Sequence, residues 1–316
     1  MASMTFDQLM QNKKRTAEVD PFESSSELAA RKKQATAADA YSRNLLRTVS
    51  AMSMDTCQVV CVPGYNGGDT ICVQQKGATG NWPGRFDTPP MKLKWSDLTG
   101  DGNLGSQYGP DKKSAKYRAV LELGTAPLLK DEFSQATDEA QAKFAENVKD
   151  ISDKVFIMML HAPEMLTEKT KKFLAMHAKM RKCKVEDLNV TTDDDLLDAW
   201  KDEYLSTPVK WSQSPVQISI DSRAFKKDYK SGSDELHRSP VPIFDRKGNR
   251  LNDNDENTCD IGNGDLVKCS FKFTTYTTPM HAFGTKFELV SITLLKKGEG
   301  SSGGAADYAE CDDIFD

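Results

Sequence analysis

The sequence lacks the features that mark membrane and secreted proteins. None of its 316 residues belong to a run of 18 apolar residues, so no membrane-spanning helix is predicted. The first eleven residues do not show the charged and then apolar layout of a secretion signal. We therefore expect a protein that stays inside the cell and is not secreted.

The chain is also poor in the residues from which catalytic and metal sites are built. Its four histidines form no HExxH motif, and neither a nucleophile elbow nor a Walker loop occurs. Seven cysteines are scattered without a CxxC pair, so we interpret them as reduced thiols rather than a disulfide or zinc framework. We expect no enzyme activity, no metal and no cofactor.

Three segments resemble sites but are better interpreted as local structure. Gly100–Gly105 satisfies GxGxxG, yet Pro110 follows closely where a dinucleotide site needs a helix. A calcium loop counted from Asp97 has Tyr108 at its twelfth position, where a bidentate Glu is required. Acids at 193–195 follow two threonines, which is typical of a capped helix start.

Charge is distributed unevenly along the chain, whose net charge is −5. Residues 301–316 hold five acids and no Lys or Arg, and residues 130–207 carry another −5. Everything else carries +5. A chain that is acidic as a whole therefore contains a mildly basic body, which is a weak indication of nucleic-acid binding.

Hydrophobic periodicity predicts strands on both sides of a helical segment. Apolar residues recur at helical spacing between 128 and 200, where Gly and Pro are almost absent, which predicts two or three helices. Residues 76–114 are rich in Gly, Pro, Asp and Asn and are expected to be mostly irregular. Short alternating or β-rich runs predict strands at 57–62, 70–75, 117–123, 209–211, 216–220, 240–244, 265–278 and 283–296.

This order favours a mainly β member of the α+β class. We expect an OB-like small barrel at 51–300, interrupted by a long helical insertion at about 128–205. Residues 1–50 are polar with two basic clusters and are expected to form a flexible basic arm. Residues 301–316 are expected to form a disordered acidic tail after a Gly/Ser-rich linker.

Two basic features stand out, and each has two interpretations. Residues 169–184 hold seven Lys or Arg and no acid, on a helix whose apolar face is expected to carry Phe173, Met176 and Met180. The strand 266–276 alternates core-like residues with lysines and Tyr276. Each of the two patterns can be interpreted as an ordinary solvated surface. Each can also be interpreted as a cationic face that binds the phosphates and bases of a single-stranded nucleic acid.

Several segments in the C-terminal third of the sequence form a familiar pattern of strands followed by an acidic C-terminus with Phe315 next to last. These segments are 214–220, 240–245, 264–273, 276, 283–284, 287–292 and 308–316. Together they resemble the last strands and the tail of the replicative single-stranded DNA-binding proteins of phages and of large DNA viruses of eukaryotes.

The resemblance implies an OB fold without catalysis that binds single-stranded DNA independently of sequence, in replication, recombination or repair. Carried over by position, the DNA face includes Lys268, Lys272, Tyr276 and Lys286. Charge and aromatic content add further candidates to this face. These are Lys210, Trp211, Arg223, Lys226, Lys227, Tyr229 and Lys230.

The resemblance implies that the last residues of the tail recruit replication proteins. The distribution of charge suggests a second hypothesis, in which the acidic tail competes with nucleic acid for the basic face and so autoinhibits binding. The residues concerned are Asp312, Asp313, Ile314, Phe315 and Asp316. The sequence does not decide whether the ligand is DNA or RNA, or whether the protein forms a homo-oligomer. If the protein is viral, it would act at a replication site in the host nucleus or cytoplasm.

A second hypothesis is a viral structural or assembly protein without nucleic-acid chemistry. In that case the arm and the tail would serve as interaction segments.

Overall fold

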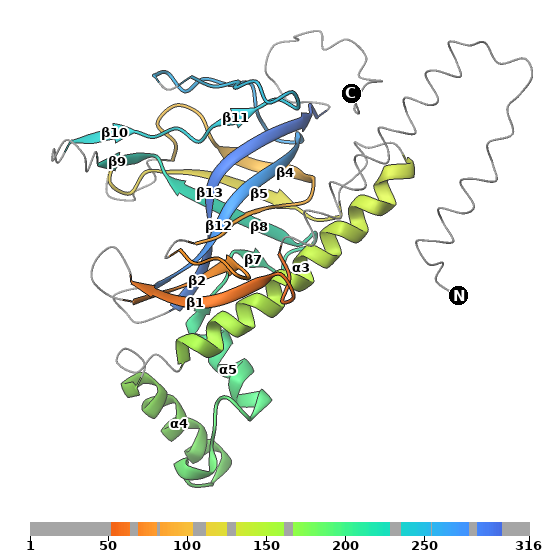
Figure 1. The fold of residues 1–316 in the computed structure, drawn as a ribbon. Helices are drawn as coiled ribbons and strands as arrows, with labels where there is room; N and C mark the ends of the chain where they lie inside the picture. Colours follow the sequence, from red (N-terminus) through yellow and green to blue (C-terminus); the bar gives the residue numbers. More distant parts are fainter. Residues whose placement is uncertain are drawn as a thin grey trace, which may run out of the picture. The chain divides into compact units, whose positions relative to one another are not determined.

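Two long antiparallel strands, β12 (Leu266–Thr277) and β13 (Phe283–Lys296), form the centre of the fold (Figure 1). Along β12 the side chains of Val267, Cys269, Phe271 and Phe273 are all fully buried. Such alternation is what a strand with one face toward the core requires. The two strands lie where the sequence predicted them.

The computed structural model describes most of the chain between residues 52 and 298, and all of these residues fall in one unit, Asn44–Ala306. The predicted arm and tail lie outside the described residues. The described ranges are 52–63, 69–80, 83–103, 112–124, 131–160, 167–227, 235–253, 255–277 and 283–298.

Five strands close into a ring. They are β4 (Met91–Asp97), β5 (Lys116–Glu122) and β8 (Gln217–Arg223), followed by β13 and β12. β12 pairs with both β13 and β4, which completes the circuit. All neighbours in the ring are antiparallel except β8 and β13, which are parallel. The ring encloses the hydrophobic side chains of alternate positions, and β-rich topology with few helices confirms the mainly β α+β class.

Shorter strands extend this sheet. β1 (Cys57–Pro63) and β2 (Asp69–Gln75) lie where two strands were predicted and pair antiparallel, and β2 adjoins β12. β3 (Arg85–Asp87) pairs with β12 inside the segment that was expected to be mostly irregular. β6 (Leu205–Ser206), β7 (Val209–Lys210) and β11 (Ile243–Phe244) add two-residue pairings.

Two sequence predictions about the segment before β12 were incomplete. Between the strands predicted at 216–220 and 240–244, where no strand was predicted, the structure has a small separate hairpin of β9 (Phe225–Lys227) and β10 (Leu236–Arg238). The strand expected at 240–244 shrinks to β11, because Pro240 and Pro242 have no N–H group to donate to a ladder.

The helical insertion consists of α3 (Asp131–Leu160), α4 (Thr167–Arg181) and α5 (Asp194–Tyr204), with a short 3₁₀ turn, η1 (Val185–Asp187). No helix among the described residues is both long and apolar enough to cross a bilayer. α3 joins the barrel core through the Phe144 ring, which lies 6.0 Å edge-on from the Phe271 ring. Gln141 fixes the same helix by donating to the Pro90 carbonyl at 2.6 Å.

Helix α5 packs through Trp200, which is fully buried and lies 4.8 Å edge-on from Phe173 of α4. Its first turn is capped as predicted, since the Asp193 carboxylate accepts the Leu196 N–H at 3.1 Å. The predicted apolar face of α4 was wrong in part. Phe173 is buried against Trp200 of α5, whereas Met176 and Met180, about one and two turns farther along α4, are 45% and 69% exposed.

Candidate functional site

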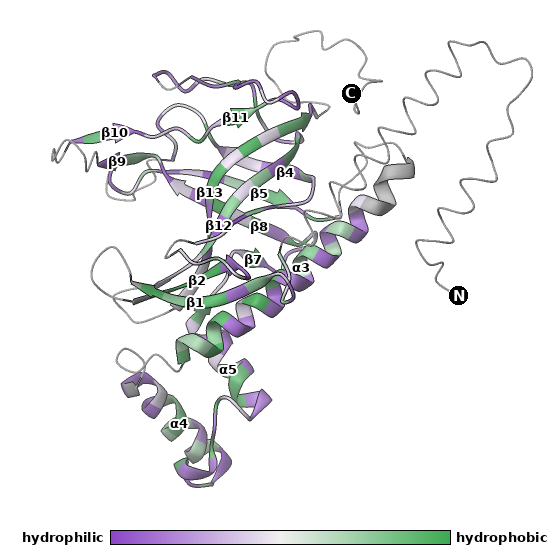
Figure 2. Ribbon diagram, viewed as in Figure 1, coloured by the Kyte–Doolittle hydropathy of each residue, from purple (hydrophilic) through white to green (hydrophobic). Residues whose placement is uncertain are grey.

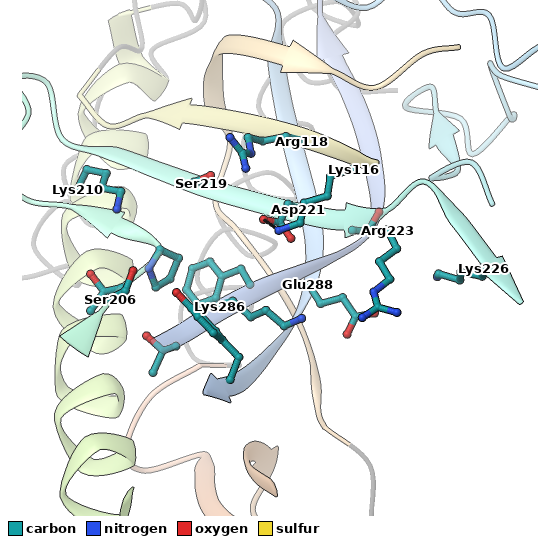
Figure 3. A pocket seen from close by; sticks show the side chains of 16 residues that line it. Lys116, Arg118, Ser206, Lys210, Ser219, Asp221, Arg223, Lys226, Lys286 and Glu288 are labelled. Carbon is teal, nitrogen blue, oxygen red and sulfur yellow. Dashed lines mark hydrogen bonds and ion pairs between the residues drawn. The ribbon is translucent and has the colours of Figure 1, made fainter. Parts of the chain in front are cut away.

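The outer face of the barrel carries a pocket that spans β5, β8 and β13 (Figure 3). Its volume is about 720 Å³, and its wall continues onto β7, β9 and the end of β12. Charged side chains from adjacent strands point into it in Figure 3. The residues that line it are Lys116, Arg118, Ser206, Thr207, Pro208, Lys210, Ser219, Asp221, Ser222, Arg223, Lys226, Tyr276, Thr285, Lys286, Phe287 and Glu288.

Strand register explains why these charges meet. Arg118 lies opposite Asp221, and Asp221 lies opposite Glu288 on the other side of β8. Lys116 lies opposite Arg223 one step along the same face. Because side chains alternate between the two faces of a strand, the intervening Tyr117, Ala119 and Ile220 turn inward and are fully buried. One face of three strands is thereby polar while the other builds the core.

Positive charge dominates the pocket. Six Lys or Arg side chains face two carboxylates, Asp221 and Glu288, which leaves a formal charge of +4. Lys116 forms an ion pair with Asp221 at 3.3 Å. The other five cations make no ion pair with a described Asp or Glu, so their charge is available to an anionic ligand. Cations concentrated in a concave wall raise the local concentration of anions.

Tyr276 forms the aromatic part of the wall. It lies opposite Gly284 in the β12–β13 pair, and a Cβ built on that glycine would stand 2.1 Å from Tyr276 Cζ. The tyrosine ring therefore occupies the space that any other side chain at 284 would need. Tyr276 is 36% exposed, so part of its ring stays open to the solvent.

Two exposed tryptophans lie on elements next to the pocket. Trp95 of β4 is 37% exposed and stands opposite Val120, on the strand face that also carries Arg118. Trp211 is 46% exposed and directly follows Lys210. A large apolar ring in solvent is costly, and exposed aromatic groups beside a binding pocket are typical of binding surfaces.

The structure brings together five of the residues predicted from the sequence, which line the pocket from five different strands. They are Lys210, Arg223, Lys226, Tyr276 and Lys286. Lys227 and Trp211 are exposed nearby but do not line it. Tyr229, Lys230 and the tail residues Asp312, Asp313, Ile314, Phe315 and Asp316 lie outside the described residues.

Lys268 and Lys272 lie farther along β12 and do not line the pocket. Lys268 is only 18% exposed and forms an ion pair with Asp87 of β3 at 3.6 Å. Lys272 stands opposite Glu288, which does line the pocket, and opposite Arg85 of β3. These lysines therefore form a second basic region that adjoins the pocket across Glu288.

Sequence reasoning missed Lys116, Arg118 and Trp95. Arg118 lies in the strand predicted at 117–123 and Lys116 directly precedes it. Their common face follows from the alternation of side chains along β5, which begins at Lys116. Nothing in the sequence indicated that this face would adjoin β8, which follows about a hundred residues later and after the helices. Only strand pairing places them there.

The pocket is suited to binding a polyanion that also has planar groups. Its cations can neutralise phosphates, and its tyrosine presents a π-face. Its polar residues are serines, threonines and charged groups, without an Asn or Gln to read a base edge by two hydrogen bonds. The described residues contain no cluster of three His, Cys, Asp or Glu placed to hold a metal ion.

Comparison with known proteins finds distant structural similarity. No family model matches this chain, and neither does a curated protein sequence. The crystal structure of gp2.5, a single-stranded DNA-binding protein encoded by bacteriophage T7, matches with a TM-score of 0.37 and 12% identity over 72% of this chain and 92% of that chain. The C-terminally truncated single-stranded DNA-binding protein from bacteriophage Enc34 matches with a TM-score of 0.36 and 12% identity over 76% of this chain and 97% of that chain. The Enc34 protein in complex with ssDNA matches with a TM-score of 0.35 and 13% identity over the same shares.

Proposed function

We propose that this protein binds single-stranded DNA without sequence preference and without catalysing a reaction. The observation that carries the proposal is the basic pocket on the outer face of β5, β8 and β13. It gathers six cations and the exposed ring of Tyr276 within one concave wall. A single strand offers phosphates to the cations and unstacked bases to the aromatic ring.

We infer that the closed ring of five strands is an OB-type barrel. Its order, β4–β5–β8–β13–β12, joins a three-stranded meander to a closing hairpin that pairs with both of the meander's outer strands. OB barrels are five-stranded and bind oligonucleotides on an outer strand face. The basic pocket lies on such a face, which supports both the fold assignment and the function.

Stacking on aromatic side chains and neutralisation of phosphates would together favour a flexible single strand, and the affinity would depend on salt. Each base stacked on an aromatic side chain contributes about 1–3 kcal/mol, so Tyr276, Trp95 and Trp211 together are sufficient for firm binding. Each neutralised phosphate releases counterions, which changes log K by about −0.7 per tenfold rise in salt for a single strand. The absence of Asn and Gln from the wall supports binding that ignores base identity.

We further propose a role in DNA replication, recombination or repair of the phage and large eukaryotic virus type. In this role the acidic tail recruits partner proteins or autoinhibits DNA binding. Supporting this, residues 301–316 carry five acids together with Ile314 and Phe315, a composition suited to basic protein surfaces that also expose apolar groups.

A fluorescence titration with oligo-dT at about 50 mM and about 200 mM salt tests the proposal. We expect tight binding at the lower salt and a steep loss at the higher one. Oligo-rU and duplex DNA in the same assay separate single-stranded DNA from RNA and from general attraction to polyanions. No binding to oligo-dT at low salt would overturn the proposed function and favour an assembly protein.

A further inference from the structure

Strands β8 and β13 form only two parallel pairs, the first of which joins Ile220 to Phe287. Before this pair the two strands separate, since β13 pairs with β6 and β8 pairs with β7. Thr207 and Pro208 connect β6 to β7, so they bridge the split between the two strands. The basic pocket reaches into this split, because Thr207, Pro208, Thr285 and Phe287 all line it.

Hydroxyl side chains are concentrated around the split. They belong to Ser206, Thr207, Ser219 and Thr285, which line the pocket from three sides of the split. In Figure 3, Ser206 lies at one end of the pocket and Lys226 at the other. The Thr207 hydroxyl is already engaged, since it donates to the Val209 carbonyl at 2.9 Å.

The hydroxyl of Thr285, by contrast, is buried without a hydrogen-bond partner. The residue is 2% exposed, and its Oγ1 has no donor or acceptor among the described residues. A buried hydroxyl that forms no hydrogen bond is unfavourable, because it has lost its contacts with water. Arg118 Nε and the Ser222 hydroxyl, which belong to the same pocket wall, lack a partner as well. Unpaired polar atoms in the wall of a pocket indicate that a ligand supplies the missing hydrogen bonds.

The position of Thr285 favours a neutral ligand group over a phosphate. Side chains alternate along β13, so Thr285 and Phe287 turn toward the core whereas Lys286 turns to the outer face. Figure 2 shows the resulting bands of hydrophobic and hydrophilic residues along β13. Next to Phe287, which is 1% exposed, a phosphate would lose its hydration in apolar surroundings. Burying a charge in this way costs far more than burying a neutral polar group.

A nucleobase meets these conditions. It is neutral and planar, and its edge carries hydrogen-bond donors and acceptors. A threonine hydroxyl can donate or accept, so Thr285 can pair with either kind of group and does not select one base. Tyr276 belongs to the same wall and presents a π-face to the ring.

We propose that the split between β8 and β13 is a base-binding slot, which one nucleobase of the bound strand enters edge first to form a hydrogen bond with Thr285 Oγ1. The phosphates on either side of that base stay on the outer face, where Lys286 and the other cations of the pocket lie. The slot is part of the proposed single-stranded DNA site and therefore rests on the proposed function.

Thr285→Val tests the slot, because valine keeps the branched shape of threonine and lacks the hydroxyl. Thr274→Val is the matched control. Thr274 on β12 is 8% exposed and its hydroxyl also lacks a partner, but it does not line the pocket. Fluorescence anisotropy of labelled oligomers measures the affinity of each variant for oligo-dT and for an abasic oligomer of the same length. Thermal melting checks folding, and neither variant should melt below the parent chain, since each loses an unpaired buried hydroxyl.

We expect Thr285→Val to bind oligo-dT about fivefold more weakly than the parent chain, which is the effect of one hydrogen bond. The abasic oligomer should bind this variant as tightly as it binds the parent, because it has no base to enter the slot. Thr274→Val should match the parent with both ligands.

The outcomes separate the slot from the proposed function. If the parent binds oligo-dT and Thr285→Val binds it equally well, the slot is wrong and the proposed function stands. An equal loss with oligo-dT and the abasic oligomer would place the sugar-phosphate backbone at Thr285 and overturn the slot. The same loss in Thr274→Val would also overturn it. If the parent does not bind oligo-dT, the proposed function fails and the slot fails with it.

Discussion

The ring of Tyr276 lies across Gly284, its partner on the neighbouring strand, and a Cβ on Gly284 would stand 2.1 Å from Tyr276 Cζ. An aromatic ring that covers a cross-strand glycine is held against the sheet on one side. Its other side stays partly exposed in the wall of the basic pocket. The absence of a side chain at Gly284 therefore fixes the position of the Tyr276 ring, which is the proposed stacking surface.

Replacing Gly284 with Ala is expected to displace the Tyr276 ring and to weaken oligo-dT binding by about 1–3 kcal/mol, the value of one stacked base. Tyr276→Leu should cost a similar amount because it removes the π-face. Tyr276→Phe keeps the ring and should bind nearly as well as the parent chain. Fluorescence titration measures all three, and wild-type affinity in Tyr276→Leu would remove this residue from the interface.

Removing two pocket cations should lower both the affinity and its salt dependence. The double variant Arg118→Gln with Lys286→Gln loses two phosphate contacts, so the slope of log K against log salt should become shallower by about 1.4. Lys247→Gln, in the exposed turn after β11, is the control and should change neither quantity. If the double variant has the same slope of log K against log salt as the parent chain, the single-stranded DNA does not cross this pocket.

Lys268→Ala with Lys272→Ala tests whether the nucleic acid continues from the pocket onto β12. We expect weaker oligo-dT binding and a shallower salt slope, but a smaller change than in the pocket variant. The reason is that Lys268 already pairs with Asp87 and is mostly covered. A change larger than that of the pocket variant would move the centre of the interface to β12.

Asp193 is expected to make the folding of α5 sensitive to acid. The hydrogen bond from Arg181, and then that from the Leu196 N–H, lower the pKa of its carboxyl below the usual value. Because the folded-state pKa is lowered, the stabilisation is present above the unfolded pKa and is lost as pH falls through the folded one. Asp193→Asn keeps a capping oxygen but loses the charge, so its melting temperature should lie below that of the parent at pH 7 and approach it at low pH. A difference that is constant with pH would contradict this assignment.

Deleting residues 303–316 tests the roles proposed for the tail. If the tail competes with nucleic acid for the basic face, the deletion should tighten oligo-dT binding, most clearly at low salt, where the charges of the tail are least screened. Fluorescence titration of both chains at about 50 mM and about 200 mM salt measures the difference. Unchanged affinity at both salt concentrations would contradict autoinhibition and leave recruitment of partner proteins as the role of the tail.

Elements that depend on residues close together in the chain could be predicted from the sequence. The alternation of lysines and core residues along β12 required a strand with one buried face, and the 3–4 spacing of Phe144, Val148 and Ile151 required a helix. Asp193 was recognisable as a cap because the N–H group that it accepts lies three residues away. The acidic tail and the basic remainder were likewise readable from residue counts.

Which strand and helix faces lie against one another could not be predicted from the sequence, because it depends on pairing and packing between distant segments. Arg118 and Asp221 are neighbours because β5 pairs with β8 across the whole helical insertion, and no local pattern encodes that pairing or its register. The same applies to Met176 and Met180, whose apolar side chains predicted burial. They are exposed although Phe173, about one and two turns earlier in α4, is buried against Trp200 of α5, because burial depends on what packs against a residue and not on its hydrophobicity alone.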